Sequence, residues 1–281
     1  MKEKVMEKVF LTIACVSVVA VLLICIFLFA SGIPAIKEIG LFEFLLGRKW
    51  KPGNDIYGIF PMIVGSVFIT IGALIVGVPI GLFMAVFMAR FCNKRVYSVI
   101  KPAVDLLAGI PSIIYGFFGL VVIVPFIRST FGGDGYSILT ASILLGIMIL
   151  PTIIGVAEAA IVAVPENYYE GALALGATHE RSVFTVVVPA AKSGIYAGIV
   201  LGIGRAIGET MAVVMIAGNQ PRITTDILKG IRTMTSNIVI EMGYSTDLHR
   251  EALIATGVIL FIFILIINLV FALIKSRAEK R

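Results

Sequence analysis

The sequence VFLTIACVSVVAVLLICIFLFA, residues 9–30, contains no charged side chain over 22 positions. About 20 consecutive apolar residues are needed for a helix to cross the hydrocarbon core of a bilayer. This stretch therefore predicts a transmembrane helix. Lysines precede it and small residues follow it, so a cleaved signal peptide is the minor alternative. Its length argues against that alternative, because the apolar region of a signal peptide usually spans about 7–15 residues.

Five further stretches have the same apolar character. Four of them are uncharged runs, between Asp55 and Arg90, Asp105 and Arg128, Asp134 and Glu158, and Glu251 and Lys275. The fifth, between Ser193 and Ala217, is interrupted only by Arg205 and Glu209. The chain is therefore predicted to be an all-α integral membrane protein, a six-helix bundle that forms a single transmembrane domain over residues 1–281. The predicted helices lie near residues 9–30, 61–89, 104–127, 137–163, 193–217 and 252–274.

The composition agrees with a membrane protein. Hydrophobic residues make up 59% of the chain and charged residues only 14%, whereas a soluble domain has about 45–50% apolar and about 25% charged residues. This excludes a cytosolic enzyme, a secreted disulfide scaffold and a disordered tail. Cys15, Cys25 and Cys92 are too few for a disulfide framework, so they are interpreted as small core thiols.

The distribution of Lys and Arg predicts the orientation. With the N-terminus inside, the cytoplasmic pieces (1–8, 90–101, 164–192 and 275–281) carry 13 Lys and Arg in 56 positions, against 9 in 73 on the other side. Positive residues are enriched in cytoplasmic loops. Both termini are therefore predicted to be cytoplasmic, and the net charge of +6 needs no nucleic-acid partner.

Glycine spacing predicts close helix packing. Gly194, Gly198 and Gly202 recur every four residues in the fifth predicted helix, and Gly77 and Gly81 do so in the second. Small residues at this spacing let a neighbouring backbone approach closely.

Arg205 and Glu209 are the first candidate functional residues. A charged side chain at a helix centre costs about 2.5–3.5 kcal/mol on insertion scales, and such residues commonly mark transport pathways. Four residues apart on one helix, the two would share a face, so a self-neutralising ion pair is the structural alternative. The less favourable order, base before acid, weakens that alternative. A guanidinium suits an oxyanion, and Glu209 would hold it in place. We therefore expect Arg205, Glu209 and the adjacent Thr210 to line a substrate pathway.

Other polar residues in or near the predicted helices have simpler explanations. Asp105 and Glu158 lie closer to the predicted cytoplasmic ends, where snorkelling or helix contacts explain them. His179 and His249 are predicted outside the membrane, as surface polar residues. Neither histidine belongs to a metal-binding motif, so no metal site is expected.

The loop at residues 164–192 has the pattern of two short helices. Pro165 and Glu166 suit a helix start, Gly176 permits a tight turn, and Thr178 suits a second start. Two helices with a glycine corner would form a rigid knob that docks into a partner, although an interfacial hairpin is equally compatible with the pattern.

The same loop carries a recognisable spacing. Glu170-Gly171-Ala172, three residues, Gly176, nine residues and then Val186-x-Val188-Pro189 resembles the EAA loop of ABC importer permeases, E-A-A-x₃-G-x₉-I-x-L-P. Gly171, Val186 and Val188 are mild departures from that pattern. The resemblance implies a type I ABC importer permease bundle. It also implies that Glu170, Gly171, Ala172 and Gly176 form a coupling helix that contacts a separate ATPase subunit.

Further segments, over residues 5–275 or so, resemble phosphate-importer permeases of the PstC type. They are Trp50-Lys51-Pro52, Tyr57-Gly58-Ile59-Phe60-Pro61, residues 107–116, residues 205–213, Thr233-Met234-Thr235-Ser236-Asn237 and His249-Arg250-Glu251-Ala252-Leu253. This resemblance implies phosphate as the transported anion and a need for Arg205 and Glu209 in transport. The implied partners are a PstA-type permease, a PstB-type ATPase dimer and a PstS-type phosphate-binding protein, in a bacterial or archaeal cell (inner) membrane.

No catalytic activity of its own is expected of the chain. It lacks the Gly-x₄-Gly-Lys-Ser/Thr phosphate loop, so ATP would be used by the partner ATPase and no cofactor would be bound here. Two alternatives stay open. The chain could be a permease for another oxyanion, such as molybdate or phosphonate, or an ion-coupled carrier or channel gated by Arg205 and Glu209.

Overall fold

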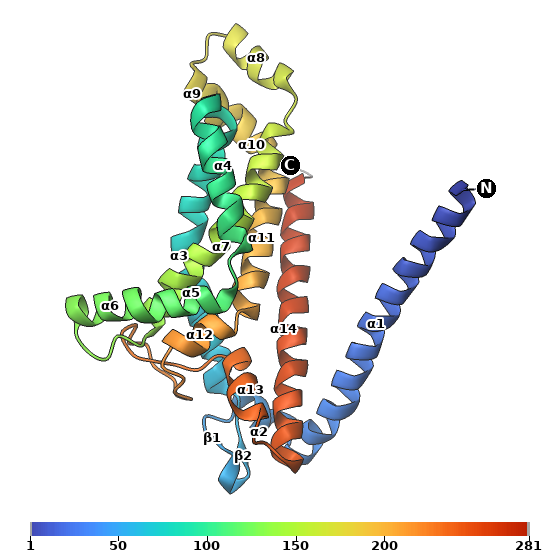
Figure 1. Cartoon of the computed structure of the whole chain (residues 1–281), viewed down its shortest axis with the longest axis vertical. Helices are drawn as coiled ribbons and strands as arrows, with labels where there is room; N and C mark the ends of the chain where they lie inside the picture. Colours follow the sequence, from blue (N-terminus) through green and yellow to red (C-terminus); the bar gives the residue numbers. More distant parts are fainter. Residues whose placement is uncertain (1, 280–281) are drawn as a thin grey trace.

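Long helices dominate the structure, a computed structural model that describes residues 2–279, with side chains described for residues 6–273. The long helices are α1 (Lys2–Ile39), α3 (Phe60–Val86), α4 (Lys94–Gly109), α7 (Ile138–Val162), α11 (Lys192–Gly208) and α14 (Asp247–Glu279). In Figure 1, α3, α7, α11 and α14 run side by side along the long axis, and α4 lies against α7.

Shorter elements connect these helices. They are α2 (Leu41–Leu46), β1 (Trp50–Lys51), the 3₁₀ turn η1 (Pro52–Asn54), β2 (Ile56–Tyr57), the π-helical turns η2 (Phe87–Phe91), η3 (Gly119–Ile123) and η4 (Val183–Val187), α5 (Ser112–Phe118), α6 (Val124–Phe131), α8 (Glu166–Ala174), α9 (His179–Ser182), α10 (Val188–Ala190), α12 (Met211–Ile216) and α13 (Met234–Met242). The strands β1 and β2 pair as an antiparallel hairpin.

The predicted bundle of membrane helices is confirmed. Within the described residues, five helices are long and apolar enough to cross a membrane. A sixth span results if two helical segments, His179–Ala190 and Lys192–Gly208, are taken together, although they meet at an angle of 69°. The bend lies at Ala191, two residues after Pro189.

The third predicted span differs from the expectation. A continuous helix over residues 104–127 is wrong, because α4 ends at Gly109 and the backbone is extended at Ile110 and Pro111 before α5 begins. Proline disfavours helical geometry in the residue before it, which explains the corner. The Tyr115 hydroxyl donates to the Leu107 carbonyl (2.8 Å) across this corner. Beyond it, α5 and α6 lie across the direction of α3 and α7 (Figure 1).

Close packing of α3 on α7 forms the centre of the bundle. A Cβ placed on Gly77 would lie 2.8 Å from the Gly146 carbonyl oxygen, and one on Gly81 would lie 2.9 Å from Ile153. The predicted close approach at these glycines is therefore confirmed. Around this contact, the largest hydrophobic core contains fully buried residues of α7, including Leu144, Leu145, Met148, Ile149 and Ile153.

This packing predicts different changes in stability for two glycine-to-alanine substitutions. Gly77→Ala should lower the free energy of unfolding by about 1–3 kcal/mol, because the added methyl group forces α3 away from α7. Gly155→Ala in α7, where a Cβ would meet nothing within 4 Å, should be neutral or should stabilise by up to about 1 kcal/mol. Thermal unfolding of the two purified variants in detergent measures the difference. Equal melting temperatures would contradict the packing.

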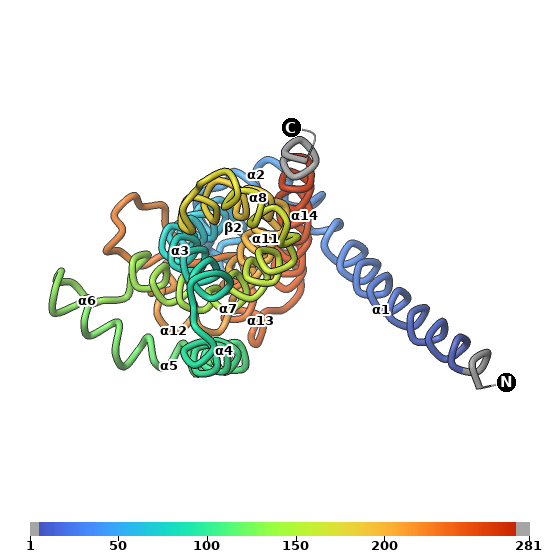
Figure 2. Tube along the Cα trace, turned by 90° about the horizontal axis from the view of Figure 1, so that it is seen from above, coloured from blue at the N-terminus to red at the C-terminus, as the bar shows by residue number. Residues whose placement is uncertain are grey.

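Helix α1 leaves the bundle. Figures 1 and 2 show it diverging from the other helices, with its C-terminal part near α14. There Phe29 packs edge-on against Phe261 (6.0 Å between ring centroids), and Gly32 faces Ala255 and Val258. Its large apolar side chains from Met6 to Phe27 are mostly exposed. Since Cys15 is exposed and Cys25 and Cys92 are partly so, the three thiols are free but are not core residues as predicted.

The two ends of the bundle carry different elements. The N-terminal end of α1 and the C-terminal end of α14 lie toward the end that carries α8, whereas α2, the β1–β2 hairpin and α13 lie at the opposite end (Figure 1). The described ends of α1 and α14 therefore lie on the side that carries the α8–α9 loop.

Candidate functional site

Arg205 lies in the last turn of α11 and is half-buried. Its Nη1 donates to the Oγ1 of Thr152 in α7, at 3.2 Å. Thr152 follows Pro151 directly, inside α7. Among the residues that the structure describes, Thr152 is the one hydrogen-bond partner of this guanidinium. The side chain is thus oriented by a neutral hydroxyl, and its charge and most of its donors have no partner among the described residues.

Glu209 lies elsewhere than predicted. Helix α11 ends at Gly208, and Glu209 is in extended conformation (φ −68°, ψ 132°), so it does not share a helix face with Arg205. Its Oε1 accepts hydrogen bonds from the backbone N–H groups of Thr210 (3.0 Å) and Ala212 (3.3 Å). In the described part of the chain no ion pair joins Glu209 to Arg205. The prediction that Glu209 holds the guanidinium is therefore wrong.

Two threonine hydroxyls donate hydrogen bonds to backbone carbonyls at the break at Glu209. The hydroxyl of Thr210 donates to the Gly208 carbonyl (3.2 Å), and that of Thr235 in α13 donates to the Glu209 carbonyl (3.0 Å). Non-helical backbone inside a membrane is tolerated where it is buried in protein or lines a water-filled cavity. Because discontinuous helices form the substrate sites of many transporters, Arg205, Thr152 and this break define the candidate pathway.

The predicted two-helix loop is confirmed in the structure. Helix α8 begins at Glu166 after Pro165, Gly176 adopts a left-handed backbone (φ +81°), and the Thr178 hydroxyl accepts from the Arg181 N–H at the start of α9. Of the predicted contact residues, Glu170, Gly171 and Gly176 are exposed and Ala172 is half-buried.

Sequence reasoning missed Leu175 in the same loop. Its side chain is 91% exposed, the largest exposed fraction among the large hydrophobic residues described. It lies between the end of α8 and the Gly176 turn, so it projects from the corner of the loop. A lone apolar residue beside a turn glycine is a signal that the sequence did contain. An exposed leucine at this corner fits a loop that inserts into a partner.

Glu158 is a buried residue bound by helix α4. Its Oε1 accepts from the Tyr97 hydroxyl (2.6 Å), and its Oε2 pairs with the Lys101 ammonium (3.0 Å). Lys101 also approaches Asp105 at 3.7 Å. The interpretation of Glu158 and Asp105 as residues in helix contacts is therefore supported. The hydrogen bond with Glu158 raises the pKa of Lys101 above its ordinary value.

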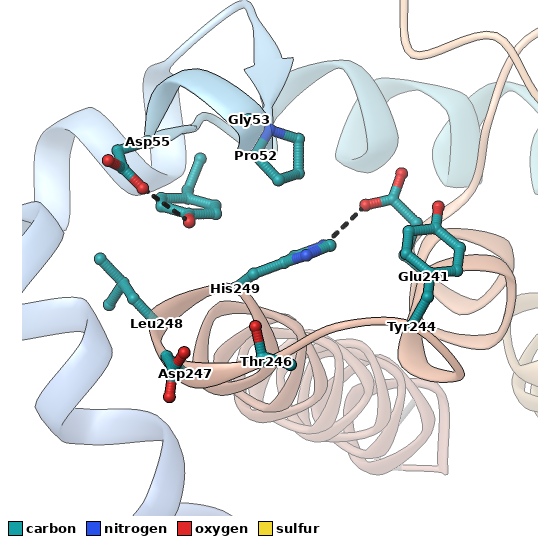
Figure 3. Close-up of a pocket in the computed structure, with 10 residues that line it drawn as sticks. Pro52, Gly53, Asp55, Glu241, Tyr244, Thr246, Asp247, Leu248 and His249 are labelled. Atoms are coloured by element: carbon teal, nitrogen blue, oxygen red, sulfur yellow. Dashed lines mark hydrogen bonds and ion pairs between the residues drawn. The ribbon is translucent and has the colours of Figure 1, made fainter.

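A second polar network lies at the opposite end of the molecule, around a cavity of about 470 Å³ (Figure 3). Glu241 in α13 accepts from Trp50 Nε1 (2.7 Å) and Arg232 Nη1 (2.5 Å), and its Oε2 lies 2.9 Å from His249 Nε2. His249 is therefore not the surface residue that the sequence predicted, since its side chain is only 14% exposed. This network joins the β1–β2 hairpin, α13 and α14.

Tyr57 forms part of the same cavity. Its hydroxyl donates to Asp55 Oδ1 (3.2 Å). Burial and this hydrogen bond raise the pKa of Tyr57 above its ordinary value. The phenol therefore stays neutral at physiological pH.

This arrangement defines a class of protein. A bundle of membrane helices, a broken helix beside an intramembrane arginine and a projecting two-helix loop are features of an ABC importer permease. The fold agrees with solved permeases of that class. The MetNI methionine ABC transporter, in an inward-facing form, gives a TM-score of 0.61 at 20% identity over 82% of this chain and 99% of its own. An amino acid ABC transporter gives 0.56 at 18% identity over 78% and 93%.

The chain belongs to the family described as "Binding-protein-dependent transport system inner membrane component", whose model matches residues 77–280. It is 36% identical to the probable ABC transporter permease protein YqgH of Bacillus subtilis, over 91% of this chain and 86% of that protein. It is 35% identical to the phosphate transport system permease protein PstC of Mesorhizobium japonicum, over 92% and 85% respectively. A probable PstC of Methanocaldococcus jannaschii is 29% identical over 95% and 92%.

Proposed function

We propose that this chain is the transmembrane permease subunit of an ATP-driven importer of inorganic phosphate and forms half of its translocation pathway. The observation that carries the proposal is Arg205, an intramembrane guanidinium that is oriented by Thr152 and not neutralised by Glu209. Such a group binds an oxyanion through charge-assisted hydrogen bonds. The names of the PstC relatives support phosphate as that oxyanion.

The proposed complex contains three kinds of partner. A PstA-type permease supplies the other half of the pathway, and a PstB-type ATPase dimer binds the loop around α8 and uses the ATP. A PstS-type protein delivers phosphate at the end that carries α13 and the β1–β2 hairpin. In this arrangement α8 and both termini are cytoplasmic, which agrees with the excess of Lys and Arg in those segments.

The proposed cycle uses the two ends of the bundle in turn. Closure of the ATPase dimer moves α8, the pathway opens toward the binding protein, and Arg205 attracts the released phosphate. Hydrolysis of ATP reverses the movement and releases the anion into the cytoplasm. A ligand shifts such an equilibrium only by its differential affinity for the two states. Since a single arginine discriminates weakly among oxyanions, selectivity for phosphate is assigned mainly to the binding protein.

The test is uptake of radiolabelled phosphate by phosphate-starved cells that lack this chain. Complementation with the wild-type gene should restore uptake, and unlabelled phosphate should compete while molybdate and methylphosphonate do not. Equal amounts of the chain in the membrane, measured by immunoblot, are the control for expression. Restored uptake of molybdate or phosphonate without restored uptake of phosphate would contradict the assignment.

A further inference from the structure

Helix α8 is attached to the bundle by a small set of side chains. None of its residues is fully buried, so hydrophobic packing alone holds it weakly. The charged contact of α8 is with Arg90, which lies in η2 at the end of α3. Arg90 Nη1 pairs with Glu166 Oε2 at 2.8 Å, and its Cζ lies 5.7 Å from the ring centroid of Tyr169, also in α8.

A second contact continues from α8 to α9. The Tyr169 hydroxyl lies 2.7 Å from His179 Nδ1, within hydrogen-bond distance. The ring of His179 packs edge-on against Phe91, with 4.7 Å between centroids, and Phe91 belongs to the same turn η2 as Arg90. The contacts thus form a closed ring from η2 through α8 and α9 back to η2. The His179 side chain is half-buried by these contacts, so its environment is more ordered than the prediction of a surface polar residue implied.

The burial of Arg90 separates this contact from an ordinary surface ion pair. The Arg90 side chain is only 12% exposed, whereas that of Glu166 is 58% exposed. Its Nε is buried without a hydrogen-bond partner among the described residues. An exposed ion pair contributes about 0–1 kcal/mol to stability, and a desolvated guanidinium adds a cost. The Arg90–Glu166 ion pair therefore contributes little to the stability of the fold.

The position of Arg90 suits transmission of movement. It lies in a π-helical turn, a form that is rare and is frequently found at functional sites. From there α3 continues into its close contact with α7 at Gly77 and Gly81, and α7 carries Thr152, the partner of Arg205. Energetic coupling between distant sites passes through such packed side chains and rigid elements.

We propose that Arg90, Glu166, Tyr169 and His179 form a latch that transmits movement of α8 to α3, and through α7 to Arg205. The proposal rests on the proposed function, because α8 must be the segment that the ATPase moves. The four residues are positioning residues: they touch neither the phosphate nor ATP. Their loss should uncouple transport from ATP hydrolysis rather than prevent assembly.

The test uses the complete reconstituted transporter, with partner permease, ATPase dimer and binding protein, in liposomes. Phosphate uptake and ATP hydrolysis are measured on the same sample for wild-type, Arg90→Ala and Tyr169→Phe. Arg90→Ala should lower the phosphate taken up per ATP hydrolysed by about tenfold, the scale of a typical coupling between sites, while the complex still assembles. Tyr169→Phe keeps the ring under Arg90 and removes the hydroxyl, so it should cause a smaller loss of the same kind.

Two controls make the result specific. Arg95→Ala removes an exposed arginine of α4 that makes no ion pair in the described residues and should leave the ratio unchanged. The double variant Arg90→Ala/Glu166→Ala should lose no more coupling than Arg90→Ala, because both changes break one contact.

The outcomes that overturn the proposal are also distinct. A wild-type ratio in Arg90→Ala and Tyr169→Phe would overturn the latch. So would additive losses in the double variant. If Arg90→Ala failed to assemble while Tyr169→Phe kept a wild-type ratio, the contact would be structural. Failure of the proposed function would look different, because the wild-type complex itself would then take up no phosphate.

Discussion

Replacing Arg205 by Ala should reduce phosphate uptake to a small fraction of the wild-type rate while leaving the protein in the membrane at its normal level. The guanidinium is the charged group that the structure places beside the break between α11 and α12, where Thr152 orients it. A hydrogen bond to a charged group contributes about 1.5–3 kcal/mol. Loss of the guanidinium should therefore lower the uptake rate by roughly a hundredfold, measured with radiolabelled phosphate in complemented, phosphate-starved cells.

Two further variants test how Arg205 acts. Arg205→Lys keeps the charge but not the planar set of donors, so it should retain part of the uptake. Thr152→Val keeps the size of the side chain and removes the orienting hydroxyl, so it should reduce uptake by about tenfold or less. Wild-type uptake in Arg205→Ala, at equal protein level, would contradict a role in the pathway and make Arg205 a structural residue.

Replacing Leu175 by Asp should prevent the chain from binding its ATPase. Leu175 is 91% exposed at the corner of the α8–α9 loop, and burial of a leucine in a partner contributes about 1.5–3 kcal/mol. A carboxylate would in addition be desolvated in that contact, so affinity should fall by roughly a hundredfold or more. Co-purification of the ATPase with the tagged permease in mild detergent measures the loss, and uptake should fall with it.

The control for this variant is Leu46→Asp. Leu46 is also exposed, at 59%, but it lies in α2, at the opposite end of the molecule (Figure 1). It should leave ATPase binding unchanged. Substitution of Gly176 is a less clean test, because its φ of +81° disfavours any side chain and would distort the turn itself. Normal co-purification of the ATPase with Leu175→Asp would place the docking contact elsewhere.

The membrane helices could be predicted because hydropathy over about 20 residues depends on local composition alone. All six predicted segments overlap a candidate span or the bent pair that ends in α11, with shifted boundaries. The third segment (104–127) and the fifth (193–217) were wrong as continuous helices, because α4 ends at Gly109 and α11 ends at Gly208. Pro111 was visible in the sequence, but an apolar run gives no sign that the helix changes direction there.

The parts of the site that failed depend on contacts between distant residues. Arg205 and Glu209 have the spacing of a helical pair. However, α11 ends at Gly208, and the Glu209 carboxylate accepts hydrogen bonds from backbone N–H groups at the start of α12. Likewise, His249 meets Trp50 and Glu241, and His179 meets Phe91, only after the chain folds. The two-helix loop of α8 and α9 was predictable, because its helix starts and its glycine turn are local signals.

The most direct test of the account is phosphate accumulation in liposomes that contain the purified complex of this chain with its partner permease and ATPase. ATP is supplied on the side of α8, and the loaded binding protein on the other side. We predict accumulation above the external concentration that requires ATP, its hydrolysis and the binding protein together. Phosphate movement that proceeds without ATP, or that stops at equal concentrations, would contradict an ATP-driven importer and favour a carrier or channel.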